Sequence, residues 1–355
     1  MSQRRQRIRF LRASDGAQLG WAEAGQGPLL VKASNWMTHL EFEWESPVWR
    51  HWMEFFSAHF RYVRYDERGC GLSDREPPTL DLERWAADLE EVCDAARPEG
   101  PFILLGISQG AHACVKFAVR HPERVSRMIL YGGYARGFYR RGRPDIEREY
   151  RAILEVMRIG WGKQNPTFRQ LFTSRFIPDG TSEQLAWFNE LCRRTAEPEM
   201  AARLLEMRGH VDVVDLLPQV KAPTLVIHAR DDNVIPLAEG RLLAAAIPDA
   251  QFVELESKNH VLLEHEPAWQ RFKDAVLEFT GAGVQSGDDA FATLSPRERD
   301  VLALLSEGLG NSEIGERLAI SEKTVRNHIS NVYDKLGVWT RAQAVVFARD
   351  HGFRR

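Results

Sequence analysis

The segment around Ser108 constrains the fold of this chain more than any other. The apolar run FILLGIS (102–108) leads into it, a helical pattern follows to about Arg120, and Ser108 stands between Gly106 and Gly110. This is G-x-S-x-G placed between a strand and a helix. Such a turn strains the backbone of the serine, and a side chain at either glycine position would clash. The pattern therefore predicts a serine hydroxyl presented above a sheet, as a hydrolase presents its nucleophile.

A serine hydroxyl is a poor nucleophile at neutral pH and needs a base and an orienting carboxylate. In a fold with this serine turn, the acid and then the histidine should follow the serine along the chain. The segment VIHARDDNVIP ends a predicted strand and offers Asp231 and Asp232. The spacing to Pro236 favours Asp232 as the carboxylate.

The base is expected in the loop after the last predicted strand. The segment LESKNHVLLEHEPAW places His260 there, with His265 and His228 as weaker candidates. We predict that Asp232 fixes the tautomer of His260 while His260 accepts the proton of Ser108.

Strand and helix patterns alternate along residues 1–280, which predicts a mostly parallel sheet. Asp15-Gly16 marks a hairpin turn near the start, and Ser46 is expected to cap a helix that begins at Pro47. From about residue 136 to 215 the pattern is helical without clear strands, which predicts an inserted helical cap.

Composition limits the partners and the compartment. The chain has 355 residues, 47 Lys and Arg against 50 Asp and Glu, and a net charge of -3, so any contact with nucleic acid must be local. Its four cysteines form no C-x-x-C pair, so we expect neither a metal site nor a disulfide framework. No apolar core follows the charged N-terminus and no window suits a membrane span, so a cytoplasmic protein without a membrane partner is expected.

A small, polar, Gly-rich segment, TGAGVQSGDDA (280–290), separates the chain into two parts. We predict a domain over residues 1–280, a linker over 281–290 and a second domain over 291–355. The second domain holds 10 basic and 8 acidic side chains and four helical segments. Its second and third helices form a predicted helix-turn-helix, capped by Asn311 and Ser321 respectively.

The third of these helices, from Glu322 to about Leu336, carries two different faces. Apolar side chains recur at three- and four-residue steps and predict a buried stripe: Val325, Ile329, Val332 and Leu336. The opposite face is short and polar, which suits hydrogen bonds to base edges in a major groove, and it comprises Arg326, Asn327, Ser330 and Asn331. Lys323, Thr324 and Lys335 flank this face and suit phosphate contacts.

Residues 7–280 resemble the α/β-hydrolase superfamily. Beside the serine turn, YDERGCGLSDR (65–75) resembles the Asp-x-Arg-Gly-x-Gly-x-Ser turn of that family, and DDNVIP and NHVLLEHEPAW resemble its acid and histidine loops. The resemblance implies an α/β-hydrolase fold with a helical cap. A serine nucleophile, in place of the aspartate of dehalogenase and epoxide hydrolase relatives, implies ester or similar acyl chemistry.

The same resemblance implies an oxyanion hole built from two backbone N–H groups. One belongs to Gln109, the residue after the nucleophile, and the other to Asn35 or Trp36 after the third strand. The usual His-Gly pair of the family is replaced here by Ala33-Ser34. This departure concerns the loop that must supply the second N–H group.

Residues 291–355 resemble the LuxR/GerE helix-turn-helix family. The resemblance runs from LSPRERDVLALL through SEKTVRNHISNVYDKLGV to RAQAVVFAR. It implies sequence-specific binding of double-stranded DNA, usually as a homodimer, with the fourth helix, about Arg341–His351, as the dimer contact.

Three functions are consistent with the sequence. The first is a transcription regulator whose hydrolase-like domain senses a small-molecule ligand or ester-like substrate, with or without hydrolysing it. The second is a serine esterase-like hydrolase whose tail serves oligomerisation or localisation, and the third is a sensor that binds a ligand at Ser108 without turnover. None of them requires a cofactor.

Overall fold

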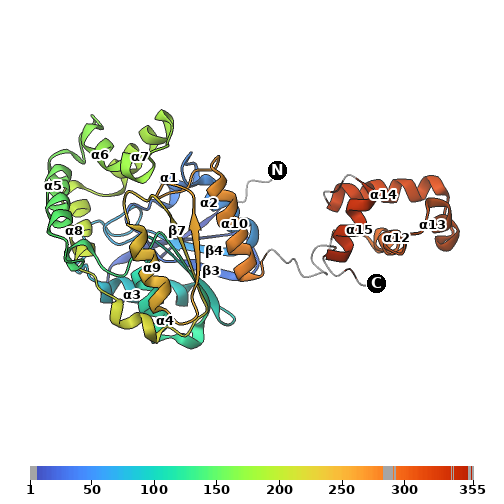
Figure 1. Ribbon diagram of the computed structural model, residues 1–355, viewed down its shortest axis with the longest axis horizontal. Coiled ribbons are helices and arrows are strands. Elements are labelled where there is room, and N and C mark those ends of the chain that lie inside the picture. Colours follow the sequence, from blue (N-terminus) through green and yellow to red (C-terminus); the bar gives the residue numbers. More distant parts are fainter. Residues whose placement is uncertain are drawn as a thin grey trace. The chain divides into compact units, whose positions relative to one another are not determined.

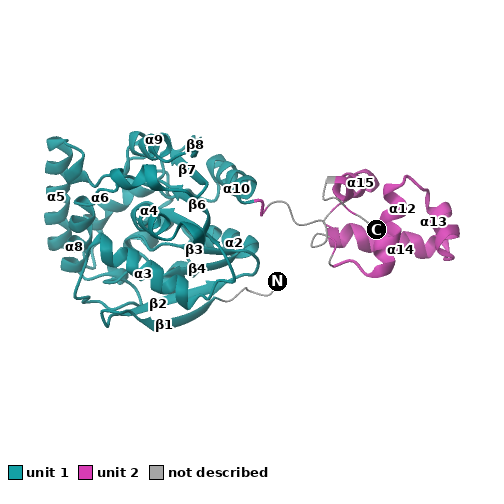
Figure 2. Cartoon of the chain, turned by 90° about the horizontal axis from the view of Figure 1, so that it is seen from below, with its two compact units in different colours: residues 1–280 teal, residues 281–355 magenta. Residues whose placement is uncertain are grey.

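The structure is a computed structural model that describes residues 6–282, 291, 293–336, 338, 340–350 and 353. The chain forms two compact units, residues 1–280 and residues 281–355 (Figure 2). Most of the predicted linker, residues 283–290, lies outside the described residues, as does His351 at the predicted end of the fourth helix.

The first unit is built on one sheet of eight strands in the order β1-β2-β4-β3-β5-β6-β7-β8. The strands are β1 (Arg7–Arg12), β2 (Gln18–Ala24), β3 (Leu29–Lys32), β4 (Arg61–Tyr65), β5 (Phe102–Ile107), β6 (Val125–Tyr131), β7 (Thr224–Ala229) and β8 (Gln251–Leu255). β1 and β2 form the predicted antiparallel hairpin, and β2 pairs antiparallel with β4. All other pairings are parallel, so the sheet is mostly parallel, as predicted.

Helices cover both faces of this sheet (Figure 1). They are α1 (Leu40–Trp44), α2 (Arg50–His59), α3 (Leu82–Ala95), α4 (Gly110–Arg120), α9 (Leu237–Ala246) and α10 (Pro267–Thr280). α2 and α10 lie on one face, and α3, α4 and α9 lie on the other. Trp52 of α2 packs 4.8 Å from both Trp269 and Phe272 of α10, measured between ring centroids, so aromatic contacts join α2 to α10.

The predicted start of α2 was wrong by one turn. Ser46 does accept hydrogen bonds through its hydroxyl, from the amides of Val48 at 2.9 Å and Trp49 at 2.8 Å. These bonds close a turn that precedes the helix, which begins only at Arg50. A serine followed by proline satisfies the same backbone donors in a turn and in a first helical turn, so the local pattern does not distinguish them.

Four helices are inserted between β6 and β7, in the range predicted for a cap. They are α5 (Pro144–Gly160), α6 (Thr167–Phe176), α7 (Ser182–Thr195) and α8 (Pro198–Gly209). α7 begins with a capping box in which Thr181 and Gln184 each accept a hydrogen bond from the backbone amide of the other. α5 packs against α6 and α8, and α6 packs against α7, so the four helices form one layer (Figure 1).

The second unit consists of four helices in its described part: α12 (Pro296–Ser306), α13 (Asn311–Leu318), α14 (Glu322–Leu336) and α15 (Arg341–Asp350). α14 buries the predicted stripe of Val325, Ile329, Val332 and Leu336. Two small apolar clusters result, one centred on Val325 against α12 and α13, the other on Val332 against α12 and α15. Small helices of this kind depend on such packing, because propensity alone does not hold an eight-residue helix.

One of the two predicted caps in this unit was wrong. Ser321 caps α14 as expected, since its hydroxyl accepts a hydrogen bond from the Thr324 amide at 3.1 Å. Asn311 is instead the first residue of α13, and Gly310 occupies the capping position. The Glu313 side chain accepts the Gly310 amide at 2.6 Å, so an acidic residue inside the helix replaces the missing cap side chain.

Within the described residues, no helix combines the length and apolar character that crossing a bilayer requires. The same part of the chain contains no cluster of three or more His, Cys, Asp or Glu side chains suited to a metal ion. All four cysteines are free and buried.

Candidate active site and nucleic-acid interface

Ser108 occupies the sharp turn between β5 and α4 that its flanking glycines predict. Its φ is +51°, in the left-handed region that a side-chain-bearing residue rarely adopts. A Cβ at Gly106 would lie 2.8 Å from the Ala111 Cα, and a Cβ at Gly110 would lie 3.2 Å from the Ala33 carbonyl oxygen. The turn therefore has no room for a side chain at Gly106 and very little at Gly110.

His260 and Asp232 are brought together as predicted. The His260 Nδ1 lies 2.6 Å from the Asp232 Oδ2, and both side chains are buried. The other carboxylate oxygen of Asp232 accepts the amides of Val234 at 2.7 Å and Ile235 at 2.9 Å. Burial by itself would raise the pKa of Asp232, but His260 and the backbone donor at Ile235 outweigh it and hold that pKa below its usual value. Asp232 is therefore an anion fixed in position beside the imidazole.

The alternative acid and bases lie elsewhere. Asp231 and His265 are exposed. His228 is buried, but its Nε2 lies 3.0 Å from the Ile235 carbonyl oxygen, and burial lowers its pKa. The Nδ1 of His228 is also unpaired among the described residues, but it lies beside Gly240, and His260 is the histidine that lines the cavity with Ser108.

The reactive atoms of Ser108 and His260 face the same small cavity. Both residues line it together with Asn35, Trp36 and Gln109. The Ser108 Oγ and the His260 Nε2 are buried and have no hydrogen-bond partner among the described residues. Buried polar atoms are ordinarily paired, so two unpaired ones on residues that line one cavity are free to contact a ligand there.

The two backbone N–H groups expected of an oxyanion hole come from the same cavity wall. The structure gives the amides of Gln109, Asn35 and Trp36 no acceptor among the described residues. Ala33-Ser34, which replaces the usual His-Gly pair, packs its carbonyl oxygens close to Gly110. The loop after β3 therefore lies close against the serine turn.

Buried charged side chains support the loop that follows β3. The Lys32 ammonium at the end of β3 donates to the Asn35 side-chain oxygen, and the Asn35 amide nitrogen donates to the Trp36 carbonyl at 3.2 Å. Deeper in the unit, Arg64 and Glu43 form an ion pair at 2.6 Å with both side chains buried. Burial lowers the pKa of Lys32 and raises that of Glu43. A charged residue ending an otherwise apolar strand was the only sequence signal for this support.

A second buried ion pair ties the cap to the serine turn. Arg208 of α8 pairs with Glu67, and its guanidinium also donates to the Gln109 carbonyl oxygen at 3.1 Å. The same guanidinium lies 3.7 Å from the centroid of the Trp85 ring. Burial raises the pKa of Glu67 against the effect of Arg208. Arg208 was not predicted as part of the site, because its partner Glu67 is 141 residues away along the chain.

The space next to Ser108 is divided into two compartments by aromatic side chains. The first is the cavity lined by Ser108 and His260, and the second lies under the cap and is lined by Tyr134, Arg141, Tyr150 and Arg175 among others. Both are lined by Trp36, Gln109, Phe172 and Phe176, and each holds about 20 Å³ of water-accessible space. This is room for about one water molecule, so a larger ligand must displace side chains.

The aromatic side chains shared by the compartments pack against one another, Trp36 edge to face on Phe172 and Phe172 tilted against Phe176. The ring centroids of Trp36 and Phe172 lie 4.9 Å apart, and those of Phe172 and Phe176 lie 4.5 Å apart. Phe176 also contacts His260, with ring centroids 5.2 Å apart, and its carbonyl oxygen accepts the His260 amide at 2.8 Å. We name Trp36, Phe172 and Phe176 the aromatic partition. Through Phe176, it connects the cap directly to the candidate base.

The polar face predicted on α14 is exposed to solvent. Arg326, Asn327, Ser330 and Asn331 are all exposed, opposite the buried stripe. Arg326 is held by Glu322 one turn earlier, at 3.4 Å. Lys323 is exposed, and Thr324 is half-buried beside Ser321 at the helix start.

Lys335 differs from the rest of this predicted group. Its ammonium lies 2.7 Å from a Glu298 carboxylate oxygen, at the start of α12. Lys335 is the main reason that the pKa of Glu298 falls to about 2. The ion pair therefore joins α14 to α12. The position of Lys335 in the sequence did not indicate this contact.

Comparison with known families decides the classification. The family model described as alpha/beta hydrolase fold matches residues 43–267, and the model described as bacterial regulatory proteins, luxR family, matches residues 292–348. The chain belongs to the α/β-hydrolase fold family. It carries a luxR-family domain at its C-terminal end, and that domain is the DNA-binding module of a bacterial regulator.

Curated relatives of this α/β-hydrolase-fold chain fall into two groups. A pyrrolizixenacetamide deacetylase of Xenorhabdus hominickii is 27% identical over 256 residues, covering 70% of this chain and 90% of the relative. A putative carbamate hydrolase of Azorhizobium caulinodans is 27% identical over 235 residues, covering 66% and 86%. The transcriptional regulatory protein LiaR of Bacillus subtilis is 35% identical over 130 residues, covering 34% of this chain and 58% of LiaR.

Solved structures support the same fold for the first unit. A hydrolase from Pseudomonas aeruginosa aligns with a TM-score of 0.63 at 25% identity, covering 77% of this chain and 98% of the hydrolase. An esterase from Exiguobacterium antarcticum aligns with the same TM-score of 0.63 at 23% identity and the same coverage.

The Arg208–Glu67 pair yields the first prediction. Arg208→Met leaves the Glu67 carboxylate buried without its partner, so we expect a loss of about 3–5 kcal/mol in the free energy of unfolding. Replacing both residues, Glu67→Met/Arg208→Met, removes the buried charge and should cost less than Arg208→Met alone. Urea unfolding followed by tryptophan fluorescence measures this, since nine of the ten tryptophans lie within residues 1–280.

A surface arginine of the same cap provides the control. Arg158 forms ion pairs with Glu155, Glu199 and Glu206 at the surface, so Arg158→Met is expected to cost about 1 kcal/mol or less. A double variant less stable than Arg208→Met would show that Glu67 is not an uncompensated charge in the single variant.

Proposed function

We propose that this protein is a ligand-responsive transcription regulator. Its luxR-family domain binds specific DNA, and its α/β-hydrolase domain binds, and hydrolyses, a small acyl compound. The observation that carries the proposal is the pairing of two sites on one chain: an exposed polar face on α14, and a cavity where Ser108, His260 and unpaired backbone amides meet. A hydrolase alone would need no such polar face, and a DNA-binding module alone would need no such cavity.

The hydrolytic step would use each group at the atom where the site presents it. The Ser108 Oγ attacks the carbonyl carbon of an ester while the His260 Nε2 takes its proton, and Asp232 stabilises the imidazolium. The oxyanion that forms is held by the Gln109 amide and by that of Asn35 or Trp36. The alcohol leaves with the proton from His260, and a water molecule then attacks the acyl-serine and releases the acid.

Two observations favour turnover over ligand binding alone. The 2.6 Å contact between His260 and Asp232 orients the imidazole, which a purely binding site would not require. The relatives named as a deacetylase and a putative carbamate hydrolase both act on acyl groups by those names. The binding-only sensor remains the second candidate, supported by the small water-accessible space of both compartments.

For DNA binding, we propose distinct roles on α14. Arg326, Asn327, Ser330 and Asn331 would contact base edges in the major groove, and Lys323 and Thr324 would contact phosphates. Lys335 would contact a phosphate only if its ion pair with Glu298 broke.

We propose that the protein forms a homodimer through α15, where 44% of the Val346 surface is exposed. A cytoplasmic location fits a DNA-binding protein whose cysteines are all free.

Hydrolysis of p-nitrophenyl acetate tests the catalytic part. We expect the wild type to release p-nitrophenolate at a rate that Ser108→Ala reduces by a factor of about 10³ or more, since the triad acts as a unit. Asp232→Asn should lower the rate by up to about 10⁴ because the imidazole takes the wrong tautomer.

His265→Ala is the matched control, because His265 is exposed and outside the cavity. Its rate should equal that of the wild type. Equal hydrolysis by the wild type and by Ser108→Ala would exclude the proposed nucleophile and favour the binding-only sensor.

Selection of DNA from a random-sequence library tests the regulatory part. The full chain should enrich a shared sequence, and Arg326→Ala/Asn327→Ala should weaken binding to it by tenfold or more, since each base contact is worth about 1–3 kcal/mol. Gel shifts on the selected fragment measure the loss.

Arg271→Ala, which removes the same charge from the exposed surface of α10, should bind the fragment as the wild type does. If the wild type enriches no sequence, the alternative function gains: an esterase-like hydrolase whose helix-turn-helix tail serves oligomerisation or localisation.

A further inference from the structure

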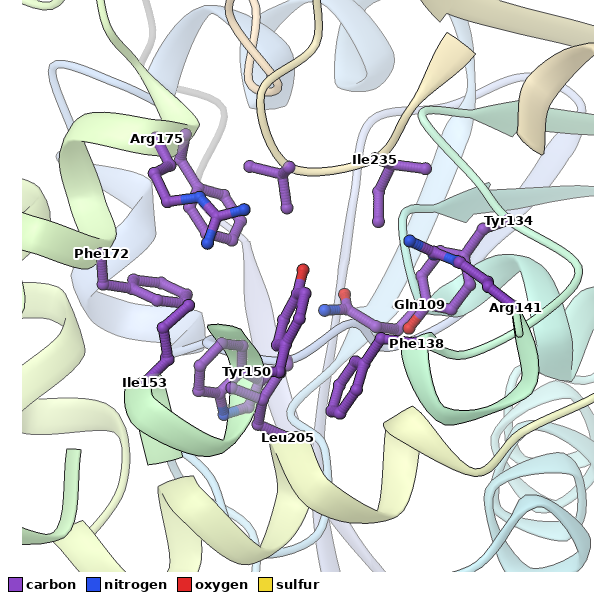
Figure 3. Close-up of a pocket in the computed structure, with 13 residues that line it drawn as sticks. Gln109, Tyr134, Phe138, Arg141, Tyr150, Ile153, Phe172, Arg175, Leu205 and Ile235 are labelled. Atoms are coloured by element: carbon purple, nitrogen blue, oxygen red, sulfur yellow. The ribbon is translucent and has the colours of Figure 1, made fainter. Parts of the chain in front are cut away.

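The compartment under the cap is distinguished by its polar groups. Apart from apolar and aromatic side chains, it is lined by two guanidinium groups, two tyrosines and one carboxamide: Arg141, Arg175, Tyr134, Tyr150 and Gln109. Figure 3 shows the two guanidinium groups entering from different sides, with the Tyr150 hydroxyl and the Gln109 carboxamide pointing into the space between them. A few convergent polar groups in an otherwise apolar pocket are the usual mark of a small-molecule site.

Arg141 is fixed in place by its surroundings. Its side chain is 7% exposed, its Nε donates to the Arg136 carbonyl oxygen at 2.8 Å, and its guanidinium lies 5.2 Å from the centroid of the Tyr134 ring. The nearest carboxylate, Glu239, lies 3.6 Å from Arg141 and 3.7 Å from Arg136. One carboxylate thus serves two guanidinium groups, so the positive charge of this corner is not neutralised.

Arg175 approaches from α6. One of its nitrogens lies 2.7 Å from a Glu149 carboxylate oxygen, another donates to the Asn233 carbonyl oxygen at 3.1 Å, and its guanidinium lies 5.6 Å from the centroid of the Tyr150 ring. Glu149 is 54% exposed, so water screens its charge, whereas the arginine side chain is 25% exposed. Together with Arg136, which shares Glu239 with Arg141, these arginines place three guanidinium groups against two glutamate carboxylates at this side of the compartment.

We propose that this compartment binds a small organic anion: a carboxylate held by Arg141 and Arg175, attached to an apolar or aromatic body packed among the ring side chains. Guanidinium groups are preferred for carboxylates because they present several N–H donors in one plane. The inference rests on the proposed function in one respect, since it names the class of ligand that the hydrolase domain recognises.

Through the aromatic partition, a ligand in the compartment under the cap can affect the cavity that Ser108 and His260 line. A compartment with about 20 Å³ of water-accessible space accepts a carboxylate-bearing molecule only if side chains move. Phe172 and Phe176 belong to the same helix as Arg175, and Phe176 contacts His260. An anion drawn to Arg175 would therefore move the partition, and with it the packing around the candidate base. Gln109 lines both compartments and points its carboxamide into the one under the cap, so it links the two directly.

Calorimetric titration of the full chain with phenylacetate and with phenylacetamide tests the proposal. The two probes differ in the charge of one group and little in shape. We expect phenylacetate to bind at least tenfold more tightly, and Arg175→Met and Arg141→Met each to weaken phenylacetate about tenfold while leaving phenylacetamide unchanged. Arg151→Met, an exposed arginine of α5 outside the compartment, is the matched control and should bind both probes as the wild type does.

The wild-type comparison needs no variant, so the test holds even if Arg141→Met fails to fold. Equal affinity for the two probes, or no binding of either, would overturn the proposed anion site. If p-nitrophenyl acetate hydrolysis and DNA binding persist in that case, only this inference fails. Loss of both activities would instead reject the proposed function itself.

Discussion

The backbone of Ser108 is held at a φ of +51°, and the arrangement of the whole site depends on that strained turn. The strain is sustained by close packing: Gly106 against Ala111, and Gly110 against the carbonyl oxygens of Ala33 and Ser34. Because the turn is fixed, the Gln109 amide and the Ser108 hydroxyl face one cavity, and the Gln109 carbonyl faces Arg208 of the cap. The sheet, the loop after β3 and the cap therefore all contact the serine turn.

The fold and the positions of Ser108, Asp232 and His260 could be predicted because their signals are local. The serine turn, the Asp232 and His260 loops and the buried stripe of α14 each lie within a short stretch whose spacing determines the geometry. Ser46 and Asn311 show the limit of such patterns. Ser46 accepts its backbone donors in a turn that precedes the helix, and Gly310 takes the capping position with its amide bonded to Glu313, so the predicted helix starts were displaced by one turn and one residue.

Three basic side chains near the site were not predicted, because their spacing in the chain does not show that the fold buries them. Lys32, Arg208 and Arg141 appear as ordinary basic residues among 47, and only the folded chain buries them beside Asn35, Glu67 and Tyr134. Lys335 shows the converse: a basic residue near the polar face of α14 is already paired with Glu298. A buried charge needs a partner, but the spacing of residues in the sequence does not show which distant residue that partner is.

We propose that the α/β-hydrolase domain is the sensor of a DNA-binding protein, with the aromatic partition between its ligand and Ser108. The most direct measurement of that claim is the DNA affinity of the full chain before and after Ser108 is modified by a fluorophosphonate, with Ser108→Ala as the control. We predict that modification changes the dissociation constant for DNA at least fivefold in the wild type and not at all in Ser108→Ala. Complete modification of Ser108 with unchanged DNA affinity would contradict it.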